Sequence, residues 1–275
     1  MNEAKQKSLT INGRAAEAAP EETLLGVARR CGVAIPTLCD HKAILPYGAC
    51  RLCVVEVAWG KRSKLVVSCV YQPSEGDVVE TDSPRVRQTR RIILELLLAR
   101  CPGVAQLAAL AKEYGAWHPR QALPEGEARN ERCILCGLCV RVCKEAIGQS
   151  AIGYANRGGR RAIASPLGVA SERCIGCRAC VHVCPTGALH AEDAGGVRLM
   201  RELRTPLALT RCRACGAPFA AAKQLAGLRG RTAVPVETLE TCPDCRRALT
   251  GRRAKTGVLT NAACETRGTG SCQKS

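Results

Sequence analysis

The stretch CIGCRACVHVCPTGAL, residues 174–189, decides the fold, because its four cysteines follow one another at intervals suited to an iron–sulfur cluster. Two, two and three residues separate the cysteines, and a proline follows the last one. The same spacing occurs once before, in CILCGLCVRVCKEA at residues 133–146, there without the proline. Closely spaced thiolates of this kind can hold three corners of a compact iron–sulfur cubane with local backbone alone. The sequence therefore predicts two [4Fe–4S] clusters.

The fourth cysteine of each run is expected to reach the other cluster, as this spacing does in two-cluster bacterial ferredoxins. The ligands predicted for the first cluster are Cys133, Cys136, Cys139 and Cys184. The ligands predicted for the second cluster are Cys143, Cys174, Cys177 and Cys180. Gly137, Gly176 and Ala179 are small and leave room for the loops to wrap the metal. The alternative is two zinc sites, but zinc knuckles come as separated pairs rather than as two identical runs of four cysteines.

A third constellation lies nearer the N-terminus, where IPTLCDHKAILPYGACRLCVVEV is followed by VVSCV. It supplies Cys39, Cys50, Cys53 and Cys69, which suit a [2Fe–2S] cluster. The first gap holds ten residues, so the pattern is a variant of the shorter plant-type spacing. A zinc-stabilised domain is the alternative, and His41 is interpreted as a solvated surface residue.

Two further pairs of cysteines follow the second run. They are Cys212, Cys215, Cys242 and Cys245. Two knuckles of this kind predict a zinc-ribbon-like module, in which two hairpin turns present four thiolates to one structural zinc ion. A single iron of the rubredoxin type is the rival interpretation.

Composition limits the class of protein. The chain has 20 cysteines among 275 residues, only 3% aromatic residues, and no apolar secretory segment after its first residues. Its longest apolar run, IILELLLA, is broken by Glu95 and is too short to span a bilayer. Such a chain is expected to be cytoplasmic, where cysteines remain reduced and bind metal rather than form disulfides.

The formal charge of +17 raises the possibility of a nucleic-acid-binding protein. Four thiolate-ligated metal sites of about −2 each would bring that charge to roughly +9. The basic residues are also spread along the chain, and aromatic residues for base stacking are scarce. These features argue against nucleic acid as a partner.

The pattern of strands and helices predicts an α+β protein. A hairpin is expected at residues 8–18 with its turn at Asn12-Gly13, followed by a helix over 20–32 and strands within 53–59, 64–70 and 76–82. Two helices are expected in 84–115, broken at residues 101–103, and a hairpin in 151–168 turning at residues 157–159.

Two parts of the chain resemble known families. The paired runs, with YANRGGRRAIASPLG between them and CPTGAL at the end, resemble the dicluster module of NADH-linked hydrogenases and of complex I-type iron–sulfur subunits. The motifs INGR, PEETLL, IPTLC and CRLCVVEV resemble the N-terminal β-grasp ferredoxin domain of complex I's large iron–sulfur subunit and of the small diaphorase subunit of hydrogenases. Those large relatives carry a further cluster after the first domain. Here only Cys101 and the distant His118 are present, so that cluster is expected to be absent and Cys101 to be a buried or helix-end thiol.

The resemblance covers residues 7 to about 190, and together with the composition and the C-terminal cysteine pairs it predicts five segments. They are a β-grasp [2Fe–2S] domain over 1–82, a helical linker over 83–129, a dicluster domain over 130–195, a zinc-ribbon-like module over 205–250 and a disordered tail over 251–275. Cys31, Cys264 and Cys272 are left without a role.

One [2Fe–2S] cluster, two [4Fe–4S] clusters and no site for hydride or acid–base chemistry predict a chain that carries single electrons. It is expected to have no catalytic site of its own. It would connect a flavin- and NAD-binding subunit with a metal-containing catalytic subunit of the hydrogenase or formate dehydrogenase type. The alternatives are a free-standing multi-cluster ferredoxin and, less favoured, a nucleic-acid-binding zinc protein.

Overall fold

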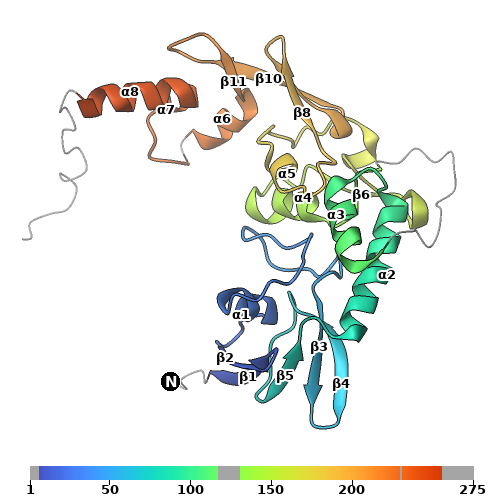
Figure 1. Cartoon of the computed structure of the whole chain (residues 1–275). Helices are drawn as coiled ribbons and strands as arrows, with labels where there is room; N and C mark the ends of the chain where they lie inside the picture. The colour runs from blue at the N-terminus through green and yellow to red at the C-terminus, as the bar shows by residue number, and fades with distance from the viewer. Residues whose placement is uncertain (1–5, 117–130, 230, 256–275) are drawn as a thin grey trace, which may run out of the picture. The chain divides into compact units, whose positions relative to one another are not determined.

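The computed structural model describes residues 6–116, 131–229 and 231–255, and Figure 1 shows its elements in chain order. The described residues form two compact units. The first contains the residues up to Cys174 together with 178–192 and 199–206, and the second contains 175–177, 193–198 and the residues from Leu207 onward. The last part of the expected linker, residues 117–129 with His118, lies outside the described residues, as do Cys264, Cys272 and the expected tail beyond Lys255.

The first unit begins with a five-stranded sheet in the order β2-β1-β5-β3-β4. Its strands are β1 Lys7–Ile11, β2 Arg14–Ala18, β3 Val54–Trp59, β4 Arg62–Val67 and β5 Asp77–Glu80. β1 pairs with β2 in an antiparallel and with β5 in a parallel arrangement. Alternate residues of β1, Leu9 and Ile11, enter a buried core with Val79 of β5. The predicted hairpin at Asn12-Gly13 and the three later strands are confirmed.

Helix α1, Leu24–Arg30, covers this core with Leu24, Leu25, Val27 and Ala28. The prediction that residues 20–22 form its first turn is wrong. The helix starts after Thr23, whose side-chain oxygen accepts a hydrogen bond from the Gly26 main-chain N–H at 3.3 Å, an N-cap contact that fixes the beginning of a helix.

Two helices follow the sheet, as predicted. Helix α2, Pro84–Arg100, is capped by Ser83 and ends at Cys101, and α3, Ala105–Tyr114, ends at Gly115. Cys101 is fully buried, so it is a helix-end thiol inside the core, as expected. Leu94 of α2 and Leu107 of α3 lie in the same buried cluster.

Short elements shape the cysteine-rich region. They are helix α4 Leu138–Arg141, the π-helical turn η1 Val142–Ala146, strands β6 Gly153–Ala155 and β7 Ala162–Ala164, the 3₁₀ turns η2 Gly158–Arg160, η3 Pro166–Gly168 and η4 Arg201–Leu203, and helix α5 Ala179–His182. β6 and β7 pair in an antiparallel arrangement, which confirms the predicted hairpin. The first cysteine run continues from α4 into η1, which is why it has no proline where the second run ends in one.

The remaining elements include a four-stranded sheet in the order β11-β10-β9-β8 and three helices. Their bounds are β8 Ala191–Ala194, β9 Val197–Met200, β10 Thr205–Arg211, β11 Pro218–Ala221, α6 Ala222–Leu228, α7 Val236–Leu239 and α8 Pro243–Lys255. β10 and β11 form a hairpin around Cys212 and Cys215. The expectation of a second hairpin at Cys242 and Cys245 is wrong, because Pro243 begins α8 and the pair lies at the start of that helix.

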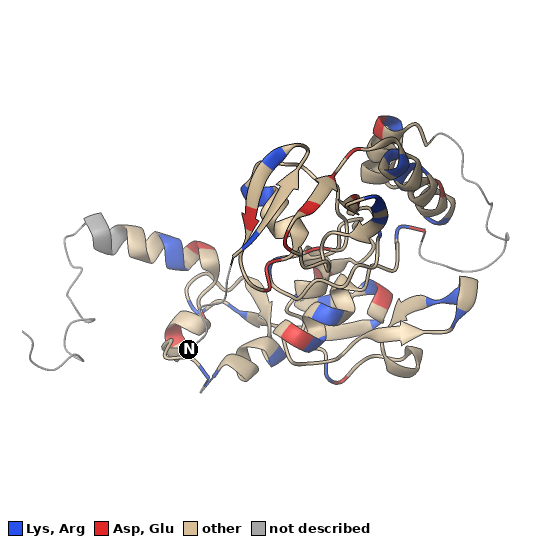
Figure 2. Cartoon of the chain, turned by 90° about the horizontal axis from the view of Figure 1, so that it is seen from below, with Lys and Arg blue, Asp and Glu red and all other residues tan. Residues whose placement is uncertain are grey.

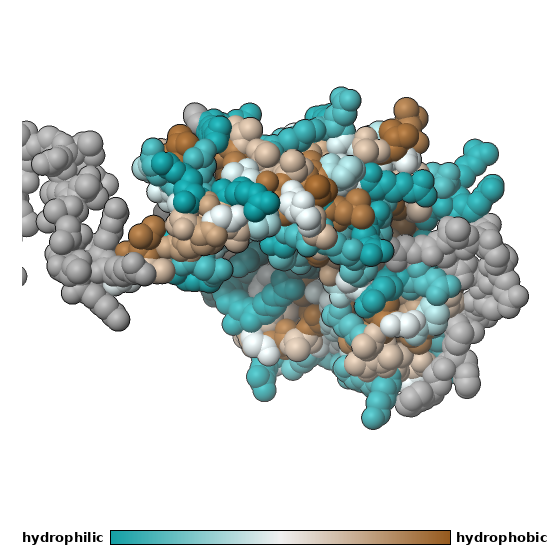
Figure 3. All heavy atoms as spheres, turned by 90° about the horizontal axis from the view of Figure 1, so that it is seen from above, coloured by the Kyte–Doolittle hydropathy of each residue, from teal (hydrophilic) through white to brown (hydrophobic). Residues whose placement is uncertain are grey.

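Charges are distributed over the elements. Figure 2 shows lysine and arginine on several helices and strands, with acidic residues among them. Figure 3 shows hydrophobic residues scattered among hydrophilic ones on the face in view. Among the helices that the structure describes, none has the length and apolarity needed to cross a bilayer.

Candidate iron–sulfur and metal centres

The N-terminal constellation is buried and its sulfurs are close together. Cys39, Cys50, Cys53 and Cys69 are each at most 6% exposed. The Cys50 main-chain N–H donates to the Cys39 sulfur at 3.3 Å, and the Leu38 N–H donates to the Cys50 sulfur at 3.4 Å. Amide donors directed at sulfur stabilise thiolate charge, as iron–sulfur sites require.

The four thiols of this constellation share hydrogen bonds. The Cys50 and Cys69 thiols hold the pKa of Cys39 at about 2, and the Cys69 thiol lowers that of Cys53 to about 7. The same contacts raise the pKa values of Cys50 and Cys69. Iron ions in place of the thiol protons would satisfy all four sulfurs, so the donor set fits a [2Fe–2S] cluster.

A cavity of about 340 Å³ brings together cysteines from both four-cysteine runs. Cys133, Cys136 and Cys139 line it from the first run, and Cys184 lines it from the second. The Ala188 main-chain N–H donates to the Cys184 sulfur at 3.1 Å. Many of the other lining residues are apolar, such as Ile134, Ile163 and Leu189. A largely apolar cavity walled by four thiols matches the needs of a [4Fe–4S] cluster.

The three thiols that the first run contributes to this cavity are hard to ionise without a metal. Burial raises the pKa of Cys136 to about 12 and also raises that of Cys139. Burial likewise raises the pKa of Cys133, although the Leu135 main-chain N–H and the Arg100 charge oppose the rise. Iron ions that replace the thiol protons remove the cost of burying bare thiolates, which is why these residues fit such a group.

Gly137, between Cys136 and Cys139, lets the Tyr154 side chain lie close to the backbone of the first ligand loop. Its φ is +78°, and a Cβ at this position would come within 2.3 Å of the Tyr154 hydroxyl oxygen. Tyr154 belongs to β6, so the hairpin between the two runs packs directly against the first ligand loop.

The cysteines predicted for the second four-iron cluster are distributed over both units. The Cys143 sulfur accepts a hydrogen bond from the Ala151 main-chain N–H at 3.3 Å, and Cys174 and Cys180 are buried. These three residues belong to the first unit, whereas Cys177 belongs to the three-residue segment of the second. Their assignment to one cluster stays a prediction.

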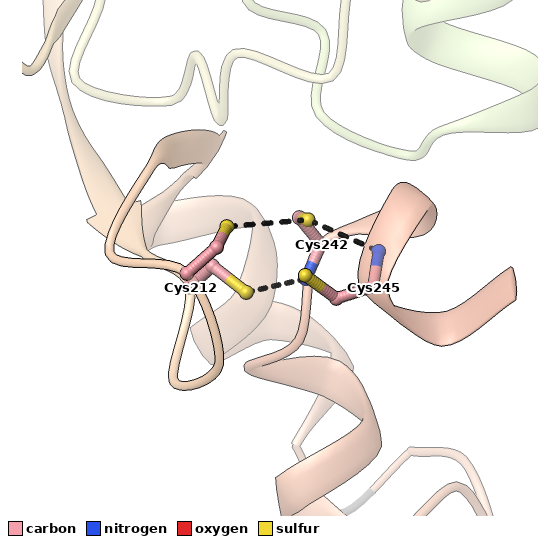
Figure 4. Close-up of side chains that lie close together, drawn as sticks. Cys212, Cys242 and Cys245 are labelled. Carbon is pink, nitrogen blue, oxygen red and sulfur yellow. Dashed lines mark hydrogen bonds between the residues drawn. The ribbon is translucent and has the colours of Figure 1, made fainter. Parts of the chain in front are cut away.

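The two C-terminal cysteine pairs bring their four sulfurs close together. The sulfurs of Cys212, Cys215, Cys242 and Cys245 all lie within 4.8 Å of one another, and Figure 4 shows the labelled side chains pointing toward a common centre. The Cys242 main-chain N–H donates to the Cys212 sulfur at 3.2 Å and is the main reason that the pKa of Cys212 falls to about 6. The neighbouring Cys242 and Cys215 thiols raise the pKa of Cys245 to about 12. A four-thiol group this tight has the donor set of a single tetrahedral metal ion.

Sequence reasoning missed several residues that hold the ligand loops. Arg90, Arg100 and Arg198 donate to main-chain carbonyls of these loops, and Tyr154 covers Gly137. The only signal in the sequence was the position of Arg90 and Arg100 on a helix that also carries an apolar run, RRIILELLLAR, at residues 90–100.

Comparison with known families supports the order of these centres. A model of the 2Fe-2S iron-sulfur cluster binding domain matches residues 4–84. Two models of the 4Fe-4S dicluster domain match residues 132–188 and 167–221. The predicted order of a [2Fe–2S] domain followed by four-iron ferredoxin sequence is therefore confirmed.

Curated relatives show the same resemblance. The chain is 36% identical over 171 residues to the NADPH-Fe(3+) oxidoreductase subunit alpha of Geobacter sulfurreducens, covering 55% of this chain and 20% of the relative. It is 31% identical over 181 residues to the mitochondrial NADH-ubiquinone oxidoreductase 78 kDa subunit of Neurospora crassa, covering 58% of this chain and 24% of the relative. The chain thus spans less than a quarter of the length of these relatives.

A solved structure is also similar. The crystal structure of an NAD+-reducing [NiFe]-hydrogenase in the H2-reduced state matches with a TM-score of 0.51 and 29% identity, covering 58% of this chain and 75% of that one. The resemblance predicted from the sequence, to complex I-type and hydrogenase iron–sulfur subunits, is confirmed by these matches.

Proposed function

We propose that this chain is an electron-transfer subunit of a multisubunit oxidoreductase. It would relay single electrons between a flavin- and NADH-reactive partner and a metal-containing catalytic partner of the hydrogenase or formate dehydrogenase type. The observation that carries the proposal is the cavity in which Cys133, Cys136 and Cys139 meet Cys184 from the other run. When bound, the clusters would supply one-electron redox chemistry, and the chain's own residues would hold and insulate them.

The ligands follow the predicted sets. The [2Fe–2S] cluster would be held by Cys39, Cys50, Cys53 and Cys69. The first [4Fe–4S] cluster would be held by Cys133, Cys136, Cys139 and Cys184, and the second by Cys143, Cys174, Cys177 and Cys180.

The buried core supports an order for the relay. Cys39 and Cys50 of the [2Fe–2S] set share one hydrophobic cluster with Cys136 of the first four-iron set, together with Leu38 and Ile134. The Cys39 charge also contributes to raising the pKa of Cys136, so the two sulfurs lie within electrostatic reach. Electrons would therefore pass between the [2Fe–2S] centre and the first four-iron centre before reaching the second.

The [2Fe–2S] ligand loop offers a surface to a partner. Between Cys39 and Cys50, the side chains of Leu45 and Tyr47 are 76% and 59% exposed. Apolar residues exposed beside a redox centre suit a protein contact, because burying them on association is favourable and brings the partner's centre near. We assign this loop to one of the two partner subunits.

The C-terminal sulfurs would hold a structural zinc ion. A single redox-active iron remains the rival, because both metals accept four thiolates in tetrahedral geometry. Zinc is favoured because the site ties the β10–β11 hairpin to the start of α8, where a closed four-sulfur centre contributes folding energy. A cytoplasmic location would suit the chain, because reducing conditions keep cysteines free to bind metal.

The test is affinity capture of the tagged full-length chain from native extract under anaerobic conditions. The expected result is a brown complex that contains a flavin-binding subunit and a nickel- or molybdenum-containing subunit. A colourless protein without iron would refute the proposal. A brown chain that is captured alone and stays monomeric would instead support the free-standing ferredoxin.

A further inference from the structure

Two arginines of helix α2 hold ligand loops by their main-chain carbonyls. Arg90 is 2% exposed, and its Nε and Nη2 donate to the carbonyl oxygens of Leu52 and Val54 at 3.1 and 2.8 Å. These carbonyls flank Cys53. Ten residues later on the same helix, the Nε of Arg100 donates to the carbonyl oxygen of Cys133 at 2.8 Å, and its Nη2 donates to that of Arg161 at 3.0 Å.

A third arginine makes the same type of contact at the second four-cysteine run. Arg198 is 2% exposed, and its Nη1 donates to the Gly176 carbonyl oxygen, next to Cys177, at 2.8 Å. Each predicted cluster therefore has a guanidinium group bonded to its ligand loop. Arginine suits this role because its planar fork donates several hydrogen bonds and stays charged when buried.

The three arginines differ in how their charge is compensated. Arg198 forms a two-pronged ion pair with the Asp193 carboxylate, with both N–O distances 2.7 Å. Among the described carboxylates, Arg90 has only Asp82, at 3.8 Å, and that carboxylate is shared with Arg87 at 2.8 Å. Arg100 forms no ion pair with a carboxylate in the part of the chain that the structure describes.

We propose that Arg90 and Arg100 set the reduction potentials of the [2Fe–2S] centre and the first four-iron centre, whereas the charge of Arg198 is cancelled by Asp193. This inference rests on the proposed function. Reduction adds one negative charge to a cluster, and a nearby cation that no close carboxylate neutralises stabilises the reduced state. Arg90 is buried, whereas Arg100 is partly exposed. Arg90 and Arg100 are thus positioning residues that also make their centres easier to reduce.

The decisive experiment is an anaerobic redox titration of the purified full-length protein, followed by electron paramagnetic resonance. Arg100→Gln keeps a hydrogen-bond donor for the Cys133 carbonyl but removes the charge. We expect it to reduce the equilibrium constant for reduction of the first four-iron centre at least tenfold, equivalent to about 59 mV for a one-electron couple. The [2Fe–2S] potential should stay unchanged, and Arg100→Lys should restore most of the wild-type value.

Two further variants separate the charge effect from a structural one. Arg85→Gln removes a charge from the same helix, but Arg85 contacts Glu56 rather than a ligand loop, so no potential should move. Asp193→Asn leaves every arginine in place and uncovers the charge of Arg198. It should therefore make the second four-iron centre easier to reduce.

Failure of this inference can be distinguished from failure of the proposed function. A wild-type protein without iron would refute the proposed function itself. Wild-type clusters with potentials that neither Arg100→Gln nor Asp193→Asn alters would overturn the present inference alone. If Arg100→Gln loses its cluster, the reduction potential of the second four-iron centre in Asp193→Asn decides. A higher potential than in the wild type supports the inference, and an unchanged potential overturns it.

Discussion

Cys143 shows how a single residue can distinguish crossed from uncrossed ligation. It follows the three cysteines that line the first cavity, yet it is not among the lining residues, and its sulfur accepts a hydrogen bond from Ala151. Cys143→Ser should therefore remove the paramagnetic signal and iron of the second four-iron cluster and leave the first intact. Cys50→Ser should remove only the [2Fe–2S] signal. Both are measured by iron analysis and electron paramagnetic resonance.

Loss of the first four-iron signal in Cys143→Ser, with the second retained, would show that each run holds its own cluster. The pairing of Cys184 with the first run would then be wrong.

Gly137 gives a second prediction at the scale of one residue. Gly137→Ala should prevent assembly of the first four-iron cluster, because a Cβ would lie 2.3 Å from the Tyr154 oxygen and φ is +78°. Gly148→Ala is the control, since Gly148 has a similar φ of +74° and no atom within 4 Å of the added Cβ. Iron content after anaerobic reconstitution measures both.

Removing the Tyr154 hydroxyl tests whether the clash with it causes the iron loss expected in Gly137→Ala. Gly137→Ala combined with Tyr154→Phe should recover part of the lost iron, because the clash is relieved while the backbone strain remains. Equal iron loss in Gly148→Ala and Gly137→Ala would show that backbone strain alone is responsible.

At this scale the kinds of iron–sulfur domain were predictable, because the cysteine spacing reflects the chemistry of the cluster. The residues that support the ligands were not. Arg100 and Tyr154 act through contacts with residues more than fifteen positions away, Cys133 and Gly137, and no local pattern encodes those contacts.

Among the elements, α2 offers the clearest test of packing, because it carries one buried and one exposed leucine two positions apart. Leu94 is fully buried in the core that also contains Cys39 and Cys136. Leu94→Ala should destabilise the folded chain by about 2–5 kcal/mol, since it deletes buried methyl groups and leaves a cavity. Leu96→Ala, on the same helix but with Leu96 51% exposed, should cost far less. Denaturant unfolding of the cluster-loaded proteins under anaerobic conditions measures the difference.

A similar loss of stability in the two leucine variants would contradict the assignment of this face of α2 to the core. Faster cluster loss in Leu94→Ala than in Leu96→Ala would add that the helix protects the metal centres.

The elements could be predicted where local chemistry decides them. Asn12-Gly13 forces a hairpin turn, and Pro102 ends a helix. The start of α1 was misjudged, because Pro20 and two glutamates are typical of a first turn, while the Thr23 cap determines the actual start. The second C-terminal pair was assigned to a hairpin by analogy with zinc ribbons, although Pro243 and the following residues favour a helix.

For the whole molecule, metal content is the sharpest prediction. Anaerobically prepared protein should contain about ten irons and one zinc per chain, from the ligand sets of three clusters and one four-sulfur site. Cys212→Ser should lose the zinc and keep the iron, because the C-terminal sulfurs form a separate group. Elemental analysis by mass spectrometry measures both metals in one sample. An additional iron in place of zinc, lost in Cys212→Ser, would identify the rubredoxin-type alternative.

The order of the centres along the chain was predictable, because each is encoded in a short cysteine motif. The division into two units was not, since it assigns Cys177 to the second unit and Cys174 and Cys180, from the same motif, to the first. Formal charge was a poor guide to function at this scale. The basic residues are spread over several helices and strands, and some, such as Arg90, are buried and hold main-chain carbonyl groups.

The cavity that joins Cys133, Cys136 and Cys139 to Cys184 has a consequence for synthesis of the chain. A ribosome delivers the first three cysteines before Cys184 is translated, so a nascent chain holds an incomplete set of thiols. With the proposed ligation, insertion of the first four-iron cluster would wait until the second run has been synthesised.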